Sequence, residues 1–381
     1  MRGWLLAPAL AVTLAAGCAS TIGTLQPDPV SFPNGSPLPG DRPARIRRIP
    51  TSGPEGPPVL LEIEERGEGL GDSLIVLVHG VFSDRRVWKF VAADLGRDRD
   101  LLLVDLAGCG GSDAPSPEAL GPAGYGPVAQ ARRVLQVLRA VQAERSAPPE
   151  LVLVGHSLGG AVILRMLCDS GLAGEFPDVL ERVRGAVLFT ALDASFVQPD
   201  PALRDVTDVS GLEIDLGNLL GMISEKTAVA VRVGVVDPSR ALRSDAERLA
   251  EILSDPARRR ATQEMIRRAV PLGEDLRPDW DEVRRIEEEY RRISVPVRLV
   301  WGARDETMPC AMGYKLAAQL PNAHLAVVPD GMHGLPTEHP WTCAQQVRTF
   351  LGDGGERGLD TTYAVAKPLV VEVIGSPVLR P

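Results

Sequence analysis

Several features that would indicate a metal, redox or nucleic-acid function are absent from this 381-residue sequence. None of its five cysteines forms a Cys-x-x-Cys pair, which argues against a zinc or redox site, and no His-rich or Asp-rich cluster suggests another metal. No Gly-x-Gly-x-x-Gly follows an apolar run, so nothing indicates a nucleotide. Arginines occur without a basic block and the formal net charge is -9, which argues against a nucleic-acid partner. We expect neither a metal nor a cofactor.

The first 19 residues predict an export signal. Residues 5–14 form an apolar stretch too short to span a bilayer as a helix, and small residues follow up to Cys18. Residues 14–18 resemble the lipobox of bacterial lipoproteins, in which the cysteine is acylated, although Ala15 stands where leucine is usual. This resemblance implies an exported lipoprotein anchored to a membrane of the cell envelope. The alternative is ordinary cleavage after Ala19, which would discard Cys18.

Proline separates a linker from the folded part of the chain. Residues 20–58 contain ten prolines and little that could form a core, which predicts a semi-rigid linker, with ordered structure from residue 59. Apolar, β-rich runs then predict strands at residues 59–64, 74–79, 101–105, 151–155, 183–190, 297–301 and 324–328. Four of these runs are almost continuously apolar, which is typical of parallel strands buried on both faces. Helical patterns lie between them, so the order predicts an α/β fold with a mostly parallel, doubly wound sheet.

The alternation of strands and helices stops between residues 194 and 295. That segment contains no convincing strand, and its spacing predicts helices at residues 243–253, 256–270 and 280–293. It also contains an apolar stripe, which could line an acyl pocket or pack on the core, at Leu212, Leu216, Leu219, Leu220 and Ile223. We interpret residues 194–295 as a helical cap. The core then comprises residues 59–193 and 296–351, followed by a tail at 352–381 in which residues 368–373 are predicted as an edge strand.

A serine in a glycine-rich turn is the strongest chemical signal. Gly-His-Ser-Leu-Gly at residues 155–159 directly follows an apolar run and opens a helical pattern. A serine on such a sharp turn has a strained backbone and projects its hydroxyl outward. The turn is so tight that side chains two positions before or after Ser157 would collide, which explains Gly155 and Gly159. The alternative is a glycine-rich turn whose serine has no catalytic role.

With this turn, residues 59–351 resemble the α/β-hydrolase family, in which Gly-His-Ser-Leu-Gly-Gly forms the nucleophile elbow. His-Gly-Val-Phe at residues 79–82 resembles the oxyanion loop of that family, and residues 105–112 resemble its Asp-x-x-Gly-x-Gly-x-Ser landmark. The resemblance implies that the backbone N–H groups of Val81 and Leu158 stabilise an oxyanion. Relatives that open epoxides or displace halide have aspartate where Ser157 stands, so both chemistries are disfavoured.

A serine nucleophile needs a base within hydrogen-bond reach, and the chain has only five histidines. His79 and His156 belong to the two glycine-containing loops and are expected to hydrogen-bond locally. His324 begins a predicted strand. His333 follows the last core strand in a loop, where the α/β-hydrolase family carries its base. His339 is the alternative.

The imidazole in turn needs a carboxylate that holds its tautomer and stabilises the imidazolium. Asp305 follows a predicted strand in Gly-Ala-Arg-Asp, which matches the Gly-x-x-Asp acid loop of the family. The rivals are Glu306, next in sequence, and Asp193, which follows the preceding strand. The order Ser157, Asp305, His333 is the one expected of this fold.

These residues predict a serine hydrolase that cleaves a carboxylic ester-like bond of a small molecule through an acyl-enzyme intermediate. The same three side chains would serve a thioesterase, a C–C bond hydrolase or a perhydrolase, because those enzymes differ in cap and pocket. A third hypothesis is a non-enzymatic binding protein of the envelope. Export would favour disulfides, so Cys310 and Cys343 either form one bridge or remain thiols, as expected for Cys109 and Cys168.

Overall fold

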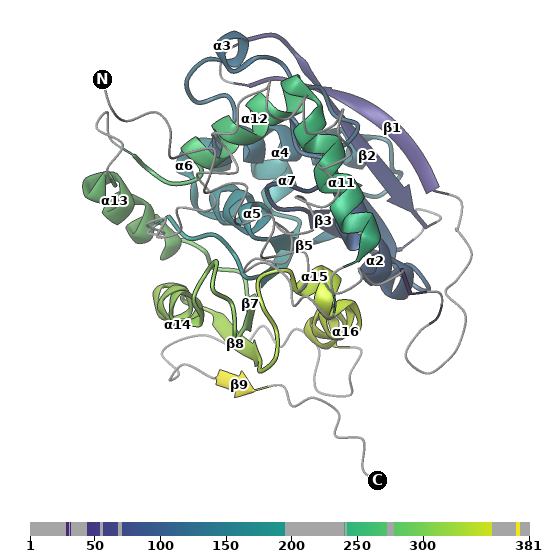
Figure 1. Cartoon of the computed structure of the whole chain (residues 1–381), viewed down its shortest axis with the longest axis vertical. Coiled ribbons are helices and arrows are strands. Elements are labelled where there is room, and N and C mark those ends of the chain that lie inside the picture. The colour runs from purple at the N-terminus through teal and green to yellow at the C-terminus, as the bar shows by residue number, and fades with distance from the viewer. Residues whose placement is uncertain are drawn as a thin grey trace, which may run out of the picture.

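The computed structural model of the chain describes residues 28–29, 31, 44–53, 56–67, 71–194, 240, 242–272, 278–352 and 371–373. Within these residues the chain forms a nine-stranded sheet with helices on both faces (Figure 1). The predicted signal segment with Cys18, and the apolar stripe at residues 212–223, lie outside the described residues.

The strands are β1 (Ala44–Thr51), β2 (Val59–Arg66), β3 (Ser73–Val78), β4 (Asp100–Val104), β5 (Glu150–His156), β6 (Val183–Phe189), β7 (Val297–Gly302), β8 (Ala323–Val328) and β9 (Val371–Val373). The helices are η1 (Arg85–Trp88), α2 (Lys89–Leu95), α3 (Pro117–Leu120), α4 (Pro127–Ala143), α5 (Leu158–Cys168), α6 (Ser170–Glu175), α7 (Pro177–Leu180), α11 (Arg243–Ser254), α12 (Pro256–Arg268), α13 (Trp280–Tyr290), α14 (Cys310–Gln319), α15 (Leu335–Glu338) and α16 (Pro340–Leu351).

The sheet has the order β1-β2-β4-β3-β5-β6-β7-β8-β9. β2 is antiparallel to both β1 and β4, and every other neighbouring pair is parallel. This arrangement confirms the predicted mostly parallel α/β sheet. The bounds of the seven predicted strands agree with the observed ones to within two residues.

Two hydrophobic cores cover the two faces of the sheet. Alternate residues of β3 belong to different cores: Leu74, Val76 and Val78 join one, and Ile75 and Leu77 join the other. The first core includes residues of α4, α5 and α14, and the second includes residues of α2 and α16. Because successive side chains of a strand point to opposite faces, continuously apolar strands require helices on both sides.

Residues 20–58 do not form a linker throughout, so the predicted start of ordered structure at residue 59 was wrong. Residues 44–51 form β1, which pairs with β2 along its whole length, from Ala44 with Arg66 to Thr51 with Val59. Only two of its side chains, Ile49 and Thr51, are buried, so it lacks an apolar pattern. At the other edge, β9 pairs with β8, which confirms the predicted strand for residues 371–373.

Helices α11, α12 and α13 lie between β6 and β7 in the chain, which confirms the three helices expected there. In Figure 1, α11 and α12 lie next to one another, and their residues contact each other. Helix α12 packs closely on the loop after β4. A Cβ added to Gly108, where φ is +90°, would lie 2.6 Å from Met265 Cε and 2.7 Å from Ala261 Cβ. This close approach fixes α12 over the carboxyl end of the sheet.

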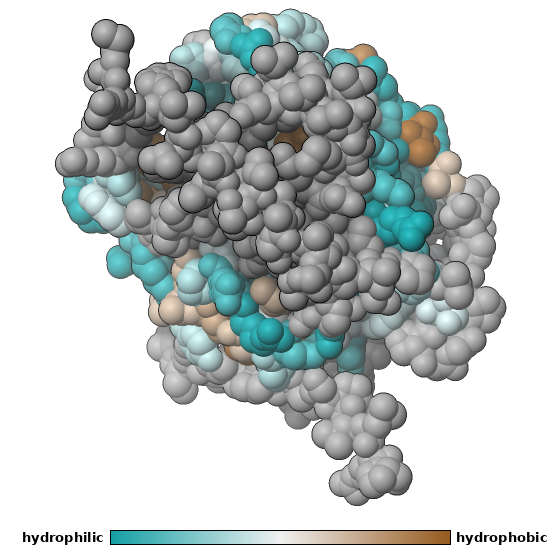
Figure 2. All heavy atoms as spheres, in the orientation of Figure 1, coloured by the Kyte–Doolittle hydropathy of each residue, from teal (hydrophilic) through white to brown (hydrophobic). Residues whose placement is uncertain are grey.

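The described surface on the face drawn in Figure 2 is mainly hydrophilic, with hydrophobic residues in small spots. No helix among the described ranges has both the length and the apolar character needed to cross a membrane. The cysteines remain thiols: no disulfide links Cys109, Cys168, Cys310 or Cys343.

Candidate active site

Ser157 occupies the sharp turn between β5 and α5. Its backbone has φ 53° and ψ -120°, a combination that a residue with a Cβ adopts only under strain. Glycines make the turn possible, as expected: a Cβ on Gly155 would lie 2.8 Å from the Gly159 carbonyl oxygen, and one on Gly159 would lie 2.2 Å from that of Val78. The Ser157 N–H donates to the Phe189 carbonyl at 3.1 Å, which ties the turn to the adjacent strand β6.

Ser157, His333 and Asp305 form one chain of hydrogen bonds. His333 Nε2 lies 3.0 Å from Ser157 Oγ, and His333 Nδ1 lies 2.9 Å from Asp305 Oδ2. A carboxylate can only accept, so Nδ1 carries the proton of the neutral ring and Nε2 is free to accept the serine proton. All three residues are buried. The structure therefore brings together the three side chains selected from the sequence.

The loops that carry Asp305 and His333 are joined through their backbones. The Arg304 N–H donates to the Gly331 carbonyl at 3.0 Å, and the other oxygen of Asp305, Oδ1, accepts the Met308 N–H at 2.7 Å. A Cβ on Gly302 would lie 2.4 Å from the Gly331 carbonyl oxygen, so only glycine permits this approach. These contacts fix the orientation of the Asp305 carboxylate that faces the imidazole of His333.

The rival residues lie elsewhere. The exposed side chain of Glu306 does not hydrogen-bond the imidazole of His333, and the buried carboxylate of Asp193 accepts from the Tyr290 hydroxyl at 3.2 Å. His339 contacts Arg240, with 2.8 Å between His339 Nδ1 and Arg240 Nη1.

The loop at residues 79–82 lies against Ser157. A Cβ on Gly80 would be 2.9 Å from Ser157 Cβ. His79 Nε2 accepts the Leu106 N–H at 3.1 Å, so its Nδ1–H donates to the Gly80 carbonyl at 2.7 Å, which confirms the expected local bonding. Burial lowers the pKa of His79, so the ring stays neutral. Neither the Val81 N–H nor the Leu158 N–H donates to another described residue.

His156 does not bond locally, so that expectation was wrong. Its Nε2 lies 2.9 Å from the main-chain carbonyl oxygen of His333, 177 positions along the chain. The Thr190 hydroxyl, just after β6, donates to the same carbonyl at 3.1 Å. Thr190 was not among the predicted site residues, because nothing in the sequence around it indicates a contact with His333.

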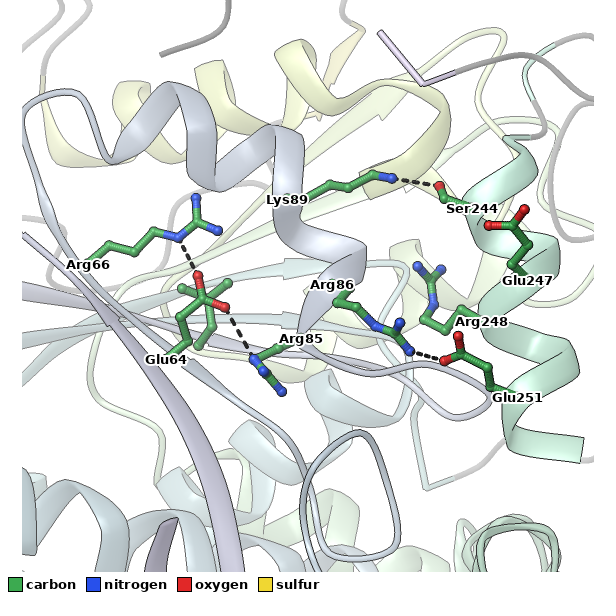
Figure 3. A pocket seen from close by; sticks show the side chains of 10 residues that line it. Glu64, Arg66, Arg85, Arg86, Lys89, Ser244, Glu247, Arg248 and Glu251 are labelled. Atoms are coloured by element: carbon green, nitrogen blue, oxygen red, sulfur yellow. Dashed lines mark hydrogen bonds and ion pairs between the residues drawn. The ribbon is translucent and has the colours of Figure 1, made fainter. Parts of the chain in front are cut away.

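A charged cavity of about 180 Å³ lies between α11 and the η1–α2 segment (Figure 3). The side chains that line it pair with one another across the gap: Arg86 bonds Glu251 at 2.6 Å, and Lys89 bonds Ser244 at 2.6 Å. These contacts connect the helical insertion to the η1–α2 segment. Ser157, His333 and Asp305 do not line this cavity. In the described part of the chain, no three His, Cys, Asp or Glu side chains are grouped to hold a metal ion.

Comparison with known proteins identifies the family. The sequence profile of the alpha/beta hydrolase family matches residues 75–342, and the chain belongs to that family. An uncharacterized protein of Mycobacterium tuberculosis is 25% identical over 271 residues, which are 68% of this chain and 69% of that protein. A pimeloyl-acyl-carrier-protein methyl ester esterase of Pectobacterium carotovorum is 25% identical over 286 residues, covering 74% of this chain and 96% of that enzyme.

The fold is shared with solved structures at lower sequence identity. The crystal structure of the esterase RhEst1 from Rhodococcus sp. ECU1013 superposes with a TM-score of 0.59 at 22% identity, covering 81% of this chain and 98% of that one. The predicted α/β-hydrolase fold is therefore confirmed.

Proposed function

We propose that this protein is a serine hydrolase that cleaves a carboxylic ester-like bond of a small molecule. The observation that carries the proposal is the hydrogen-bond chain from Ser157 Oγ through the imidazole of His333 to Asp305. A hydroxyl next to an unprotonated imidazole nitrogen, whose other nitrogen is held by a carboxylate, is the arrangement that activates serine for acyl transfer.

In the first half of the reaction, Ser157 Oγ attacks the ester carbonyl carbon while its proton moves to His333 Nε2. The imidazolium that forms is stabilised by Asp305, which stays ionised. His333 then gives that proton to the leaving alkoxide oxygen. The C–O bond breaks, the alcohol departs, and the acyl group remains on Ser157.

In the second half, His333 takes a proton from water as the water oxygen attacks the acyl carbon. The proton then passes to Ser157 Oγ as the acyl bond breaks, which releases the carboxylic acid and restores the free serine. No cofactor takes part in this scheme. Protons pass only between Ser157, His333, the leaving alcohol and water.

We assign the developing oxyanion to the N–H groups of Val81 and Leu158. The carbonyl oxygen and the N–H of a trans peptide point in opposite directions. His79 holds the Gly80 carbonyl, so the Val81 N–H of the same peptide points away from His79. Leu158 is the first residue of α5, where backbone N–H groups lack an intrahelical acceptor. One such donor contributes about 2.7–4 kcal/mol to transition-state stabilisation in a well-studied protease.

The names of two similar proteins support the ester assignment. The Pectobacterium carotovorum relative is a methyl ester esterase, and the Rhodococcus structure is an esterase. An ester is therefore the first bond to test, ahead of a thioester or a C–C bond.

Labelling with a fluorophosphonate tests the nucleophile without knowledge of the substrate. We expect wild type to react covalently and Ser157→Ala to fold but not to react. Equal labelling of the two proteins, or no labelling of folded wild type, would reject the assignment. A panel of p-nitrophenyl esters, acyl thioesters and diketones then identifies the bond, and preferential turnover of the diketones would replace the ester assignment by a C–C hydrolase.

We also propose that Cys18 anchors the mature protein to a membrane of the cell envelope. The support is the sequence of residues 14–18 and the proline-rich segment that follows. Attached acyl chains give durable binding because each buried CH₂ contributes about 0.8 kcal/mol. Mass spectrometry of the N-terminal peptide from protein expressed in bacteria should find acylated Cys18 in the membrane fraction. A mature N-terminus that starts after Ala19 would contradict the proposal, and Cys18→Ser serves as the control.

A further inference from the structure

The main-chain carbonyl of His333 is held by two side chains from other parts of the sheet. His156 Nε2 donates to it at 2.9 Å from the end of β5, and Thr190 Oγ1 donates at 3.1 Å from the residue after β6. All three residues are buried. The carbonyl belongs to the same residue whose imidazole faces Ser157, so its position helps to set the position of the ring.

Thr190 adopts a backbone conformation that threonine avoids. Its φ is +41°, and its side chain is fully buried. A β-branched residue at positive φ is an outlier whose strain costs about 1–3 kcal/mol, and such residues cluster at functional sites. Only three non-glycine residues in the described part of the chain have positive φ, and the other two are Ser157 and Phe82. The strain is thus concentrated around the nucleophile, the loop at residues 79–82 and the carbonyl of His333.

His156 is suited to hold a carbonyl and unsuited to act as a base. Burial lowers the pKa of His156 to about 3, with a smaller effect from the charge of nearby His333, so the ring stays neutral. Since Nε2 faces a carbonyl, it carries the proton, and the buried Nδ1 has no hydrogen-bond partner among the described residues. The two imidazole rings are 5.1 Å apart. A neutral His156 adds no positive charge beside His333 when that ring takes up a proton.

We propose that His156 and Thr190 are positioning residues, which hold His333 in register with Ser157 by fixing its main-chain carbonyl. The inference rests on the proposed serine hydrolase function. His156 precedes Ser157 in the chain, so its hydrogen bond completes a closed ring: Ser157 side chain, His333 side chain, His333 carbonyl, His156 side chain and backbone. A ring of this kind makes the distance between nucleophile and base insensitive to movement of the loop after β8.

The first experiment compares two substitutions of His156. Glutamine can place an amide N–H close to the position of Nε2, whereas leucine has similar bulk and no donor. We expect His156→Leu to lower the rate of fluorophosphonate labelling at Ser157 roughly tenfold to a hundredfold, because small displacements of a catalytic group have effects of this size. His156→Gln should recover most of the wild-type rate. On the ester that wild type hydrolyses best, the loss should appear in kcat with little change in KM.

The second experiment repeats the comparison at Thr190 and combines the two sites. Thr190→Val is nearly isosteric and removes only the donor, whereas Thr190→Ser keeps it. We expect the valine variant to react more slowly and the serine variant to react like wild type. The double variant His156→Leu, Thr190→Val should lose more than the product of the single losses, because in each single variant the remaining donor still restrains the carbonyl in part. Thermal unfolding of each variant identifies those that fail to fold, and the Thr190 pair remains informative if His156→Leu does so.

The outcomes separate the two proposals. If wild type does not label, the serine hydrolase function fails. If wild type labels and Ser157→Ala does not, but folded His156→Leu and Thr190→Val both label at the wild-type rate, only the positioning role fails. Equal losses in the leucine and glutamine variants would likewise refute the donor role of His156.

Discussion

The strained backbone at Ser157 makes a prediction about stability that is independent of the substrate. Replacing Ser157 by alanine or by glycine removes the same hydroxyl and the same hydrogen bond to His333. The two variants differ in the Cβ, which is strained at φ 53° and ψ -120°. Glycine adopts positive φ without this cost, so we expect Ser157→Gly to be more stable than Ser157→Ala.

The size of the difference follows from two opposing terms. Relief of strain favours glycine by about 1–3 kcal/mol. The larger conformational entropy of glycine in the unfolded chain opposes it by about 0.4–1 kcal/mol. The net difference is about 1 kcal/mol in favour of glycine, which corresponds to about 2–4 °C in the midpoint of thermal unfolding for a large domain.

Urea denaturation of both variants, followed by circular dichroism, measures this difference. Lys315 provides a control, because it is exposed in the middle of α14 and both substitutions remove the same side chain beyond Cβ. There the alanine variant should be the more stable one by about 0.5–1 kcal/mol, since glycine is unfavourable in the interior of a helix. Opposite signs at positions 157 and 315 are thus expected. If alanine is at least as stable as glycine at position 157, the turn is not strained and the reasoning is wrong.

Three further predictions concern the acid, the cap and pH. Asp305→Asn should slow fluorophosphonate labelling about 10³–10⁴-fold without unfolding, because asparagine favours the imidazole tautomer that cannot accept the serine proton. Gly108→Ala should lower the free energy of unfolding by roughly 1–3 kcal/mol and increase hydrogen exchange in α12, because its Cβ would overlap Met265. Burial raises the pKa of Asp84, but the hydrogen bonds from Arg86 and the positive charges of Arg248 and Arg86 together outweigh burial and leave the pKa below its usual value. The resulting stabilisation is present above the usual pKa and is lost as pH falls through the lower one, so wild type and Asp84→Asn should differ less in urea denaturation at pH 3 than at pH 7.

The sequence predicted the elements whose signal is local. Buried parallel strands are apolar along their whole length, so β3, β4, β5 and β7 stand out in the sequence. The turn at Ser157 was predictable because its glycines, strand and helix are adjacent in the chain. Asp305 and His333 were selected because each follows a predicted strand at the place where the α/β-hydrolase family carries its acid and its base.

Structural features that depend on contacts with residues far away in the sequence were not predicted. The strand β1 is polar and mostly exposed, and it is a strand because β2 offers backbone groups to pair with. The contacts of His156 and Thr190 involve the backbone carbonyl of His333. Every residue has a backbone carbonyl, so the amino-acid sequence does not indicate which one accepts these bonds. The cavity beside α11 depends on how the insertion lies on the sheet, which spacing along the chain does not encode.

The separation of the site residues along the chain also affects how the protein regains activity after denaturation. Ser157 and His333 are 176 positions apart, and the chain between them forms β6, β7 and β8, which must all be paired with β5 or with one another to bring the imidazole to the hydroxyl. Helical circular dichroism can return as soon as local segments form. Reactivity of the Ser157 hydroxyl returns only when the half of the sheet on the β8 side has assembled. The rate at which fluorophosphonate labelling recovers during refolding would therefore measure the assembly of that half.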